Sequence, residues 1–139
     1  MKILILEDDV HLLKLLVRIM SKYGEYYATD NGADAVRVFG EAMEEGAPFD
    51  VALLDIMLPG IDGYEVLGHI RRIEASHKRD GLDGAKVIMV TALNGAKNIM
   101  YAFQENCEAY LTKPYSSEEL ESTLASLGVN QPVAIAWRI

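Results

Sequence analysis

The sequence predicts a three-layer α/β sandwich, in which helices cover both faces of a mostly parallel β-sheet. Two observations favour this class. Short apolar runs without alternating polar positions recur along the chain, as expected of strands that are buried on both faces. Segments of helical periodicity separate these runs with short connections, and this alternation favours parallel strands joined by right-handed crossovers.

Five strands and five helices are expected. The strands, in chain order, are KILIL (2 to 6), EYYAT (25 to 29), VALLD (51 to 55), KVIMV (86 to 90) and EAYLT (108 to 112). The first, third and fourth are the continuous apolar runs, and the other two complete the sheet. Helical patterns span about 10 to 22, 33 to 45, 64 to 76 and 96 to 106, and a fifth helix follows the last strand.

Local signals mark where several of these elements begin or end. Asp9 precedes the first helix and can cap it, and Gly46 follows the second helix as a stop signal. Pro59 and Gly60 explain why the third strand ends directly after its acid.

The last helix has a capping box in the motif YSSEEL. Ser116 and Glu119 are spaced to bond each other's backbone N–H groups, while Tyr115 and Leu120 are placed as a hydrophobic staple. This helix should therefore begin near Ser117.

Length and composition limit the function. At 139 residues, half of them hydrophobic, the chain has the size of one domain with its own core. Its net charge of -8 argues against nucleic-acid binding by this chain and against attraction to anionic membranes. Met1 leads directly into the first strand without a signal peptide, and no apolar run approaches the roughly 20 residues of a membrane span, so a cytoplasmic protein is expected. The single cysteine, Cys107, cannot form an internal disulfide, which fits a reducing compartment.

Acidic residues follow two of the predicted strands. Glu7, Asp8 and Asp9 come after the first strand, and Asp55 ends the third. Ligands of open α/β sheets bind outside the carboxyl ends of strands, and these two strands are neighbours if the sheet has the order 2-1-3-4-5, which the family resemblance described below implies. Three of the four carboxylates would then crowd together and repel one another. A magnesium ion bound by carboxylates resolves this repulsion, whereas helix capping alone accounts only for Asp9.

Two further strand ends bring polar groups to the same crevice. Thr91 closes the fourth strand in VIMVTA, and Lys113 follows the fifth in AYLTKP. With Asp55 they supply a hydroxyl, an ammonium and a nucleophilic carboxylate beside the expected metal. This set of groups is typical of phosphoryl transfer to an aspartate.

The motifs ILEDD, LLDIMLPGIDGYE, VTA and YLTKP together resemble the receiver domains of two-component response regulators, of the single-domain chemotaxis-like type. The resemblance covers residues 1 to about 127. It implies a flavodoxin-like, doubly wound fold with a five-stranded parallel sheet of order 2-1-3-4-5 and five helices. It also implies a phosphorylation-activated receiver in a phosphorelay, with Mg²⁺ as cofactor and a sensor histidine kinase or phosphotransfer protein as partner. Such a receiver is not an enzyme acting on another substrate, because it catalyses only its own phosphorylation and slow dephosphorylation.

The resemblance assigns roles to the residues of the crevice. Asp55 is the phosphoacceptor, which takes a phosphoryl group from a phosphohistidine of the kinase. Glu7 and Asp8 hold magnesium together with Asp55, and the backbone carbonyl of Met57 adds a ligand. Lys113 pairs with the acyl phosphate.

Other matched positions concern switching and the lifetime of the phosphorylated form. The Thr91 hydroxyl would swing to the phosphoryl group, and Tyr110 matches the aromatic residue whose rotamer follows that movement. Pro114 stands where the family has a cis peptide bond. Met57 and Leu93 flank the approach of the attacking water, and because both are apolar and bulky they predict slow dephosphorylation.

Two other functions stay open at this point. A phosphorylation-independent interaction module would be expected to have lost an acid, the phosphoacceptor, the hydroxyl or the lysine, and none is missing. An aspartyl-phosphate phosphatase would need a second carboxylate two residues beyond its nucleophile, where this chain has Met57. The three histidines, His11, His69 and His77, do not converge in this arrangement.

The segment after the last helix, GVNQPVAIAWRI (128 to 139), forms a C-terminal tail with an apolar run that ends in Trp137. We expect this tail to dock on its own domain or on a second copy of the chain, so a homodimer stays open. The sequence names neither the kinase nor the downstream protein target, and it leaves open whether the receiver stands alone or belongs to a longer protein.

Overall fold

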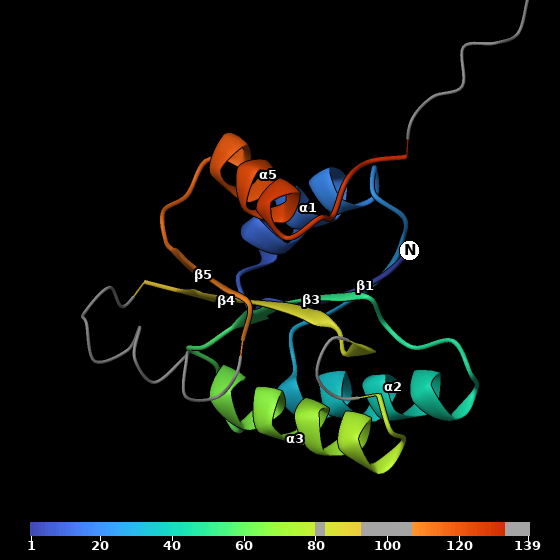
Figure 1. Ribbon diagram of the computed structural model, residues 1–139. Coiled ribbons are helices and arrows are strands. Elements are labelled where there is room, and N and C mark those ends of the chain that lie inside the picture. The colour runs from blue at the N-terminus through green and yellow to red at the C-terminus, as the bar shows by residue number, and fades with distance from the viewer. Residues whose placement is uncertain (80–82, 93–106, 133–139) are drawn as a thin grey trace, which may run out of the picture.

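The computed structural model describes residues 1–79, 83–92 and 107–132, and a five-stranded parallel sheet forms its middle layer (Figure 1). The strands are β1 (Lys2–Leu6), β2 (Glu25–Thr29), β3 (Val51–Asp55), β4 (Lys86–Thr91) and β5 (Ala109–Thr112). Their spatial order is β2-β1-β3-β4-β5, and every neighbouring pair is parallel. The predicted fold class and strand order are therefore confirmed.

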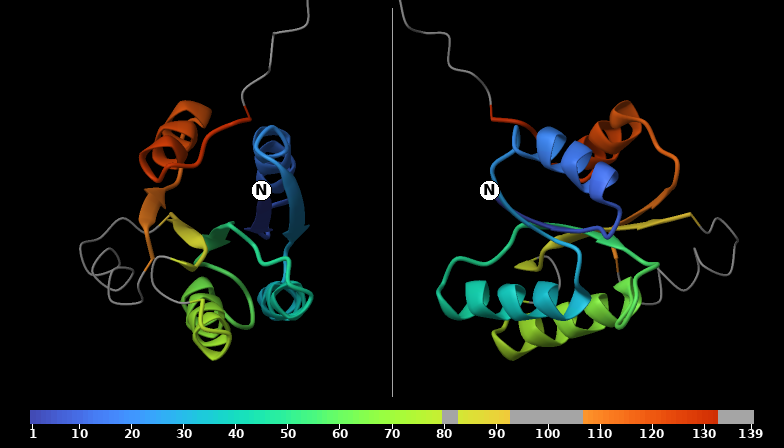
Figure 2. Two further views of the ribbon diagram at one scale, coloured as in Figure 1. Left: turned by 45° about the vertical axis from the view of Figure 1, so that its right-hand side comes forward. Right: turned by 180° about the vertical axis from the view of Figure 1, so that it is seen from behind.

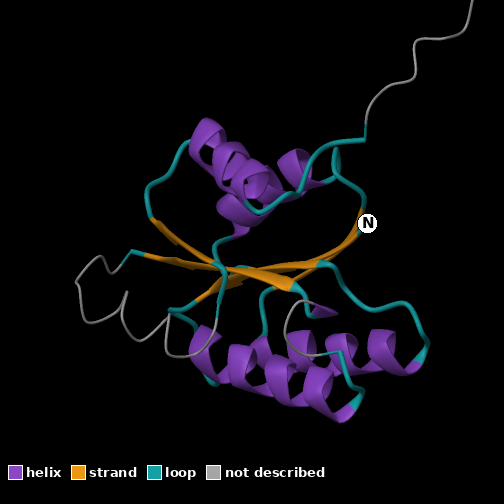
Figure 3. Ribbon diagram, in the orientation of Figure 1, coloured by secondary structure: helices purple, strands orange, loops and turns teal. Residues whose placement is uncertain are grey.

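Helices cover both faces of this sheet, as Figure 3 shows by secondary-structure type. The described helices are α1 (Val10–Met20), α2 (Gly32–Glu44), α3 (Gly63–Ser76) and α5 (Ser117–Ser126). Two views agree that α1 and α5 lie over one face, with α2 and α3 over the other (Figure 2). The helix expected at about 96 to 106 falls on residues that the structure does not describe. Within the described part, no helix is both long and apolar enough to cross a membrane.

Each face of the sheet carries its own hydrophobic core. Along β1, Leu4 and Leu6 pack toward α2 and α3, while Ile3 and Ile5 pack toward α1 and α5. Every residue of β3 is buried, because this strand has a neighbour on each side and helices above and below. The continuous apolar runs of the sequence thus have a physical cause, since both faces of a central parallel strand need apolar side chains.

The helix ends follow the predicted capping signals. The Asp9 carboxylate accepts from the backbone N–H groups of the first turn of α1, and Ser116 forms a reciprocal capping box with Glu119 at the start of α5. Gly46 follows α2 with a φ of +77°, a left-handed conformation in which glycine avoids the strain of a Cβ atom. A second capping box, Asp62 with Glu65 at the start of α3, was not predicted from the sequence.

Gly63 fixes the position of α3 against the end of β3. A Cβ atom on this residue would collide with the backbone carbonyl of Asp55 and the Cα atom of Ile56. Only glycine allows this close approach without moving the helix. The carboxyl end of β3 is therefore tightly packed on the side of α3, which limits movement of Asp55.

A network of ion pairs ties α3 to the amino ends of β4 and β5. Arg71 Nη1 donates to Glu74 Oε1, and Arg71 Nη2 donates to Glu108 Oε1, both at 2.8 Å. Glu74 is 1% exposed and accepts a 2.6 Å hydrogen bond from the backbone of Ala85, while Glu108 accepts from Val87 at 2.7 Å. The charge of a buried glutamate is thus paired and hydrogen-bonded.

The described part of the tail begins next to this core. Val129 is 4% exposed and packs against the cluster on the side of α1 and α5. The apolar run with Trp137, on which the docking prediction depends, falls on positions 133–139, which are not described.

Candidate functional site

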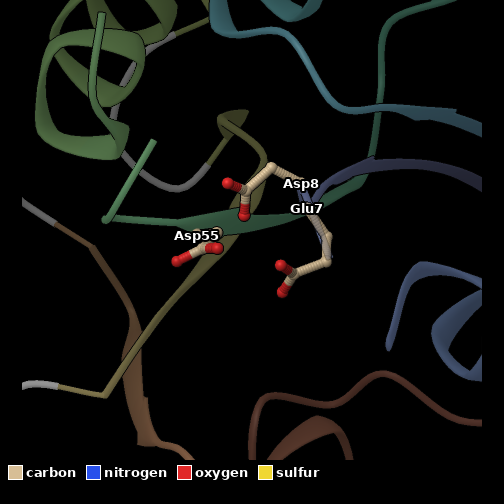
Figure 4. Close-up of side chains that lie close together, drawn as sticks. All are labelled: Glu7, Asp8 and Asp55. Atoms are coloured by element: carbon tan, nitrogen blue, oxygen red, sulfur yellow. The ribbon is translucent and has the colours of Figure 1, made fainter. Parts of the chain in front are cut away.

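Three carboxylates meet at the carboxyl ends of β1 and β3. Leu6 pairs with Leu54 in the sheet, so Glu7 and Asp8 emerge beside Asp55. One carboxylate oxygen from each acid lies within 4.8 Å of the others, and Figure 4 shows the three side chains gathered around the end of β3. Asp55 and Glu7 are buried, whereas Asp8 is exposed and leaves the cluster open to solvent.

Lys113 supplies the positive charge of this cluster from the segment after β5. Its Nζ atom lies 2.9 Å from Glu7 Oε1 and 3.1 Å from Asp55 Oδ2. Backbone N–H groups bond the other oxygens, from Met57 to Asp55 Oδ1 at 3.1 Å and from Asp9 to Glu7 Oε2 at 3.0 Å. Asp55 is therefore held at both oxygens, at one by a backbone N–H two residues further along the chain and at the other by the distant Lys113.

The electrostatics of the cluster favour a cation. Burial raises the pKa of Asp55 to about 7, with the nearby Glu7 carboxylate adding to the rise and the Lys113 ammonium opposing it. Burial alone would lower the pKa of Lys113, but the bonds and charges of Glu7 and Asp55 outweigh it and the pKa is raised. Three acids thus share one ammonium, which leaves negative charge uncompensated.

The donor set fits magnesium. Magnesium binds oxygen ligands, takes one or two carboxylates readily and keeps water or phosphate oxygens in its other positions. Among the described residues, Glu7, Asp8 and Asp55 form the one group of histidine, cysteine and acidic side chains close enough together to hold a metal. His11, His69 and His77 are exposed and take no part in it.

Thr91 lies at the same edge of the sheet. It ends β4, is fully buried, and its carbonyl accepts a 2.6 Å hydrogen bond from the backbone of Lys113. The preceding residue, Val90, is paired with Asp55 in the sheet. The structure therefore brings together the threonine, the lysine and the acids that the sequence pattern selected.

The other predicted residues have different surroundings. Tyr110 lies in β5 and packs against the core on the side of α2 and α3, where burial raises the pKa of its phenol. Met57 is 55% exposed at the rim of the site, two residues beyond Asp55. Leu93 lies just past the described segment that ends at residue 92. The peptide bond between Lys113 and Pro114 is cis, as predicted.

Sequence reasoning missed one feature of Tyr115. Its ring packs with the core that contains Leu120, in agreement with the predicted hydrophobic staple. Its hydroxyl oxygen is buried without a hydrogen-bond partner, and the charges of Glu7 and Asp55 act on it. No local signal could have revealed this, because the burial of the hydroxyl depends on how distant segments pack around it.

Comparison with known proteins identifies relatives of the chain. The family model of the response regulator receiver domain matches residues 3–125. The transcriptional regulatory protein TcrA of Mycobacterium tuberculosis is 31% identical over 132 residues, covering 95% of this chain and 47% of that protein. The chain thus spans about half the length of the curated relatives it matches.

Solved structures show the same architecture. A DNA-binding response regulator of the LuxR family from Staphylococcus aureus has a TM-score of 0.71 at 35% identity, over 91% of this chain and 97% of that one. The CheX-CheY complex with BeF3 and Mg²⁺ from Borrelia burgdorferi has a TM-score of 0.76 at 23% identity, over 93% and 90% of the two chains. The second likeness concerns the fold alone.

Proposed function

The chain belongs to the family of response regulator receiver domains and is a signalling receiver, and on that premise we propose that Asp55 is its phosphoacceptor. The observation that carries the proposal is the contact of Asp55 with Lys113, 3.1 Å apart, beside the carboxylates of Glu7 and Asp8. A nucleophile, a cation and a pair of acids that can hold a metal then lie at one edge of the sheet. Phosphoryl transfer uses these groups.

In the proposed reaction a carboxylate oxygen of Asp55 attacks the phosphorus of a phosphohistidine on a partner kinase or phosphotransfer protein. The new P–O bond forms as the P–N bond breaks, and the imidazole leaves as a neutral base after taking a proton. Lys113 pairs with the transferred phosphoryl oxygens. Glu7, Asp8, Asp55 and the backbone carbonyl of Met57 would hold magnesium, which supplies positive charge at the oxygens of the phosphoryl group when bound.

Phosphorylation would add about 1.5 to 2 negative charges at the end of β3. Thr91 and Tyr110 are the proposed switch, with the hydroxyl of Thr91 turning to the phosphoryl group and the ring of Tyr110 following. These two movements would change the protein-contact surface around β5 and α5, and a downstream protein would recognise the changed surface. The core packing of Tyr110 supports this role, because a change of its rotamer must alter that packing.

The chain is proposed to act in the cytoplasm through protein contacts rather than as an enzyme on another substrate. It would catalyse only its own phosphorylation and a slow dephosphorylation, with Met57 and Leu93 limiting the access of water. Residues 1 to 127 would make up the receiver, and the tail from 128 to 139 would dock on this domain or on a second copy. Binding to nucleic acid is not expected of this acidic chain.

The test is chemical labelling. The protein is incubated with magnesium and phosphoramidate, then analysed by intact mass and by peptide mapping. We expect one phosphoryl adduct at Asp55 that depends on magnesium, is absent from Asp55→Asn, and persists in Asp30→Asn, an exposed acid changed in the same way. The proposal fails if a control receiver is labelled and this protein is not, or if Asp55→Asn carries the same adduct.

A further inference from the structure

The proposed phosphorylation site assigns no role to the hydroxyl of Tyr115. Among the residues that the structure describes, it is the one buried side-chain oxygen or nitrogen without a hydrogen-bond partner. Buried hydroxyls are rarely left unpaired, because they lose their hydrogen bonds to water and gain none in return. An exception next to a functional site therefore points to a partner that another state of the protein provides.

The position of Tyr115 directs this hydroxyl inward. The residue follows Pro114 directly, and its half-buried ring helps to line a surface pocket of about 340 Å³ together with Leu12 and Lys113. The hydroxyl oxygen, in contrast, is shielded from solvent. The ring is thus anchored by apolar packing, while its hydroxyl lies in the protein interior.

Two charges act on this hydroxyl, those of Glu7 and Asp55. Burial and then these two negative charges raise the pKa of Tyr115, so the phenol keeps its proton. A neutral hydroxyl close to a carboxylate is a hydrogen-bond donor. Unlike an ammonium, it adds no positive charge that would oppose a metal ion at the same carboxylate.

Once Asp55 is phosphorylated, the Glu7 carboxylate could accept a hydrogen bond from such a donor. In the present structure its two oxygens are bonded by Lys113 and by the backbone of Asp9. Under the proposed function Lys113 pairs with the phosphoryl group on Asp55, and this new partner would compete with Glu7 for the same ammonium. The Glu7 carboxylate, which is 1% exposed, would then keep one hydrogen-bond donor beside the magnesium ion, and a second donor would replace the bond that Lys113 gives up.

We propose that Tyr115 is a positioning residue for Glu7, whose carboxylate accepts a hydrogen bond from the Tyr115 hydroxyl, directly or through one water, when Lys113 pairs with the phosphoryl group. The inference rests on the proposed function of Asp55 and adds a role that the acid, threonine and lysine motifs do not include. The contact keeps Glu7 directed at the metal site while the lysine is engaged elsewhere.

The test compares Tyr115→Phe with the wild type and with Tyr23→Phe. The control removes a hydroxyl from a tyrosine that packs in the same core, is 4% exposed, and follows α1 at the opposite end of the sheet. Magnesium affinity is measured by calorimetry with beryllofluoride present as the phosphoryl mimic. Tyr115→Phe should bind magnesium about fivefold more weakly, as expected for the loss of one hydrogen bond to a carboxylate, and Tyr23→Phe should match the wild type.

Two measurements separate positioning from simple packing. In wild-type protein labelled with ¹³C at the tyrosine Cζ atoms, the Tyr115 resonance should move when magnesium and beryllofluoride are added to the metal-free protein. In EDTA, Tyr115→Phe should unfold at the same or a higher urea concentration, because the hydroxyl has no partner to lose. An unmoved resonance, an unchanged magnesium affinity or a lower urea midpoint would each overturn the inference.

The two proposals can fail separately. If wild-type protein takes up neither beryllofluoride nor a phosphoryl adduct, the role of Asp55 is wrong and that of Tyr115 falls with it. If the wild type is labelled and Tyr115→Phe binds magnesium equally well, only the positioning role is lost. The resonance of the wild-type protein keeps the test decisive even if the variant folds poorly.

Discussion

Replacing Asp55 by asparagine should stabilise the metal-free protein near pH 8. The folded structure holds the pKa of Asp55 at about 7, against an ordinary 3.8, because of burial and the nearby Glu7 carboxylate. One pKa unit corresponds to about 1.4 kcal/mol, so ionising this carboxyl in the folded state costs roughly 4 kcal/mol. Asparagine has a similar shape and cannot ionise. We expect its free energy of unfolding to exceed that of the wild type by about 2 to 4 kcal/mol.

The sign of the pH dependence follows from the raised pKa. Because the folded state binds the proton more tightly than the unfolded state, the stability that protonated Asp55 provides is complete below about pH 4. It is lost as the pH rises from about 4 through about 7, where Asp55 ionises in the folded protein. The advantage of Asp55→Asn should therefore shrink by more than half between pH 8 and pH 5.

Urea unfolding followed by circular dichroism in EDTA measures this difference at both pH values. The matched control is Asp30→Asn, which changes an exposed acid between β2 and α2 and should leave the stability nearly unaltered. Magnesium should then stabilise the wild type more than Asp55→Asn, because ligand binding to the folded state adds stability and the variant has lost one ligand. A less stable Asp55→Asn at pH 8, or an advantage that does not change with pH, would refute this account of the site.

Four further outcomes are expected. Asp8→Ala should weaken magnesium binding at least tenfold in a calorimetric titration, because it removes both a charge and a ligand oxygen, and an unchanged affinity would place the ion elsewhere. The double variant Met57→Asn with Leu93→Glu should lose its phosphoryl group faster than the wild type when decay is followed by intact mass, and equal rates would show that these side chains do not set the lifetime. Glu74→Ala should lower the free energy of unfolding in urea by about 2 kcal/mol, since it leaves the buried backbone N–H of Ala85 without its acceptor and removes one of the two carboxylates paired with Arg71, and a loss near zero would contradict that reasoning. Deleting residues 128–139 should lower stability or change the oligomeric mass measured by light scattering, and no change in either would argue against a docked tail.

Much of the fold and of the site could be predicted because both have local signatures. A central parallel strand needs apolar side chains on both faces, so VALLD was readable as a buried strand, and β3 is buried throughout. Capping chemistry is equally local, since Ser116 and Glu119 bond each other within one helical turn. The candidate site residues were recognised from polar groups that follow apolar runs, because the carboxyl ends of parallel strands share one edge of the sheet.

Which polar groups from distant segments meet was decided only by the tertiary structure. The sequence places Arg71 and Glu74 one turn apart on a predicted helix and Glu108 in a distant segment, yet the fold joins all three in one ion-pair network at the amino ends of β4 and β5. It likewise buries the hydroxyl of Tyr115 without a hydrogen-bond partner. The physical reason is that a charge or a hydroxyl acts strongly only over a few ångström. Which segments meet within that distance depends on the strand order and on how α3 and the segment after β5 pack, and no local sequence pattern specifies either.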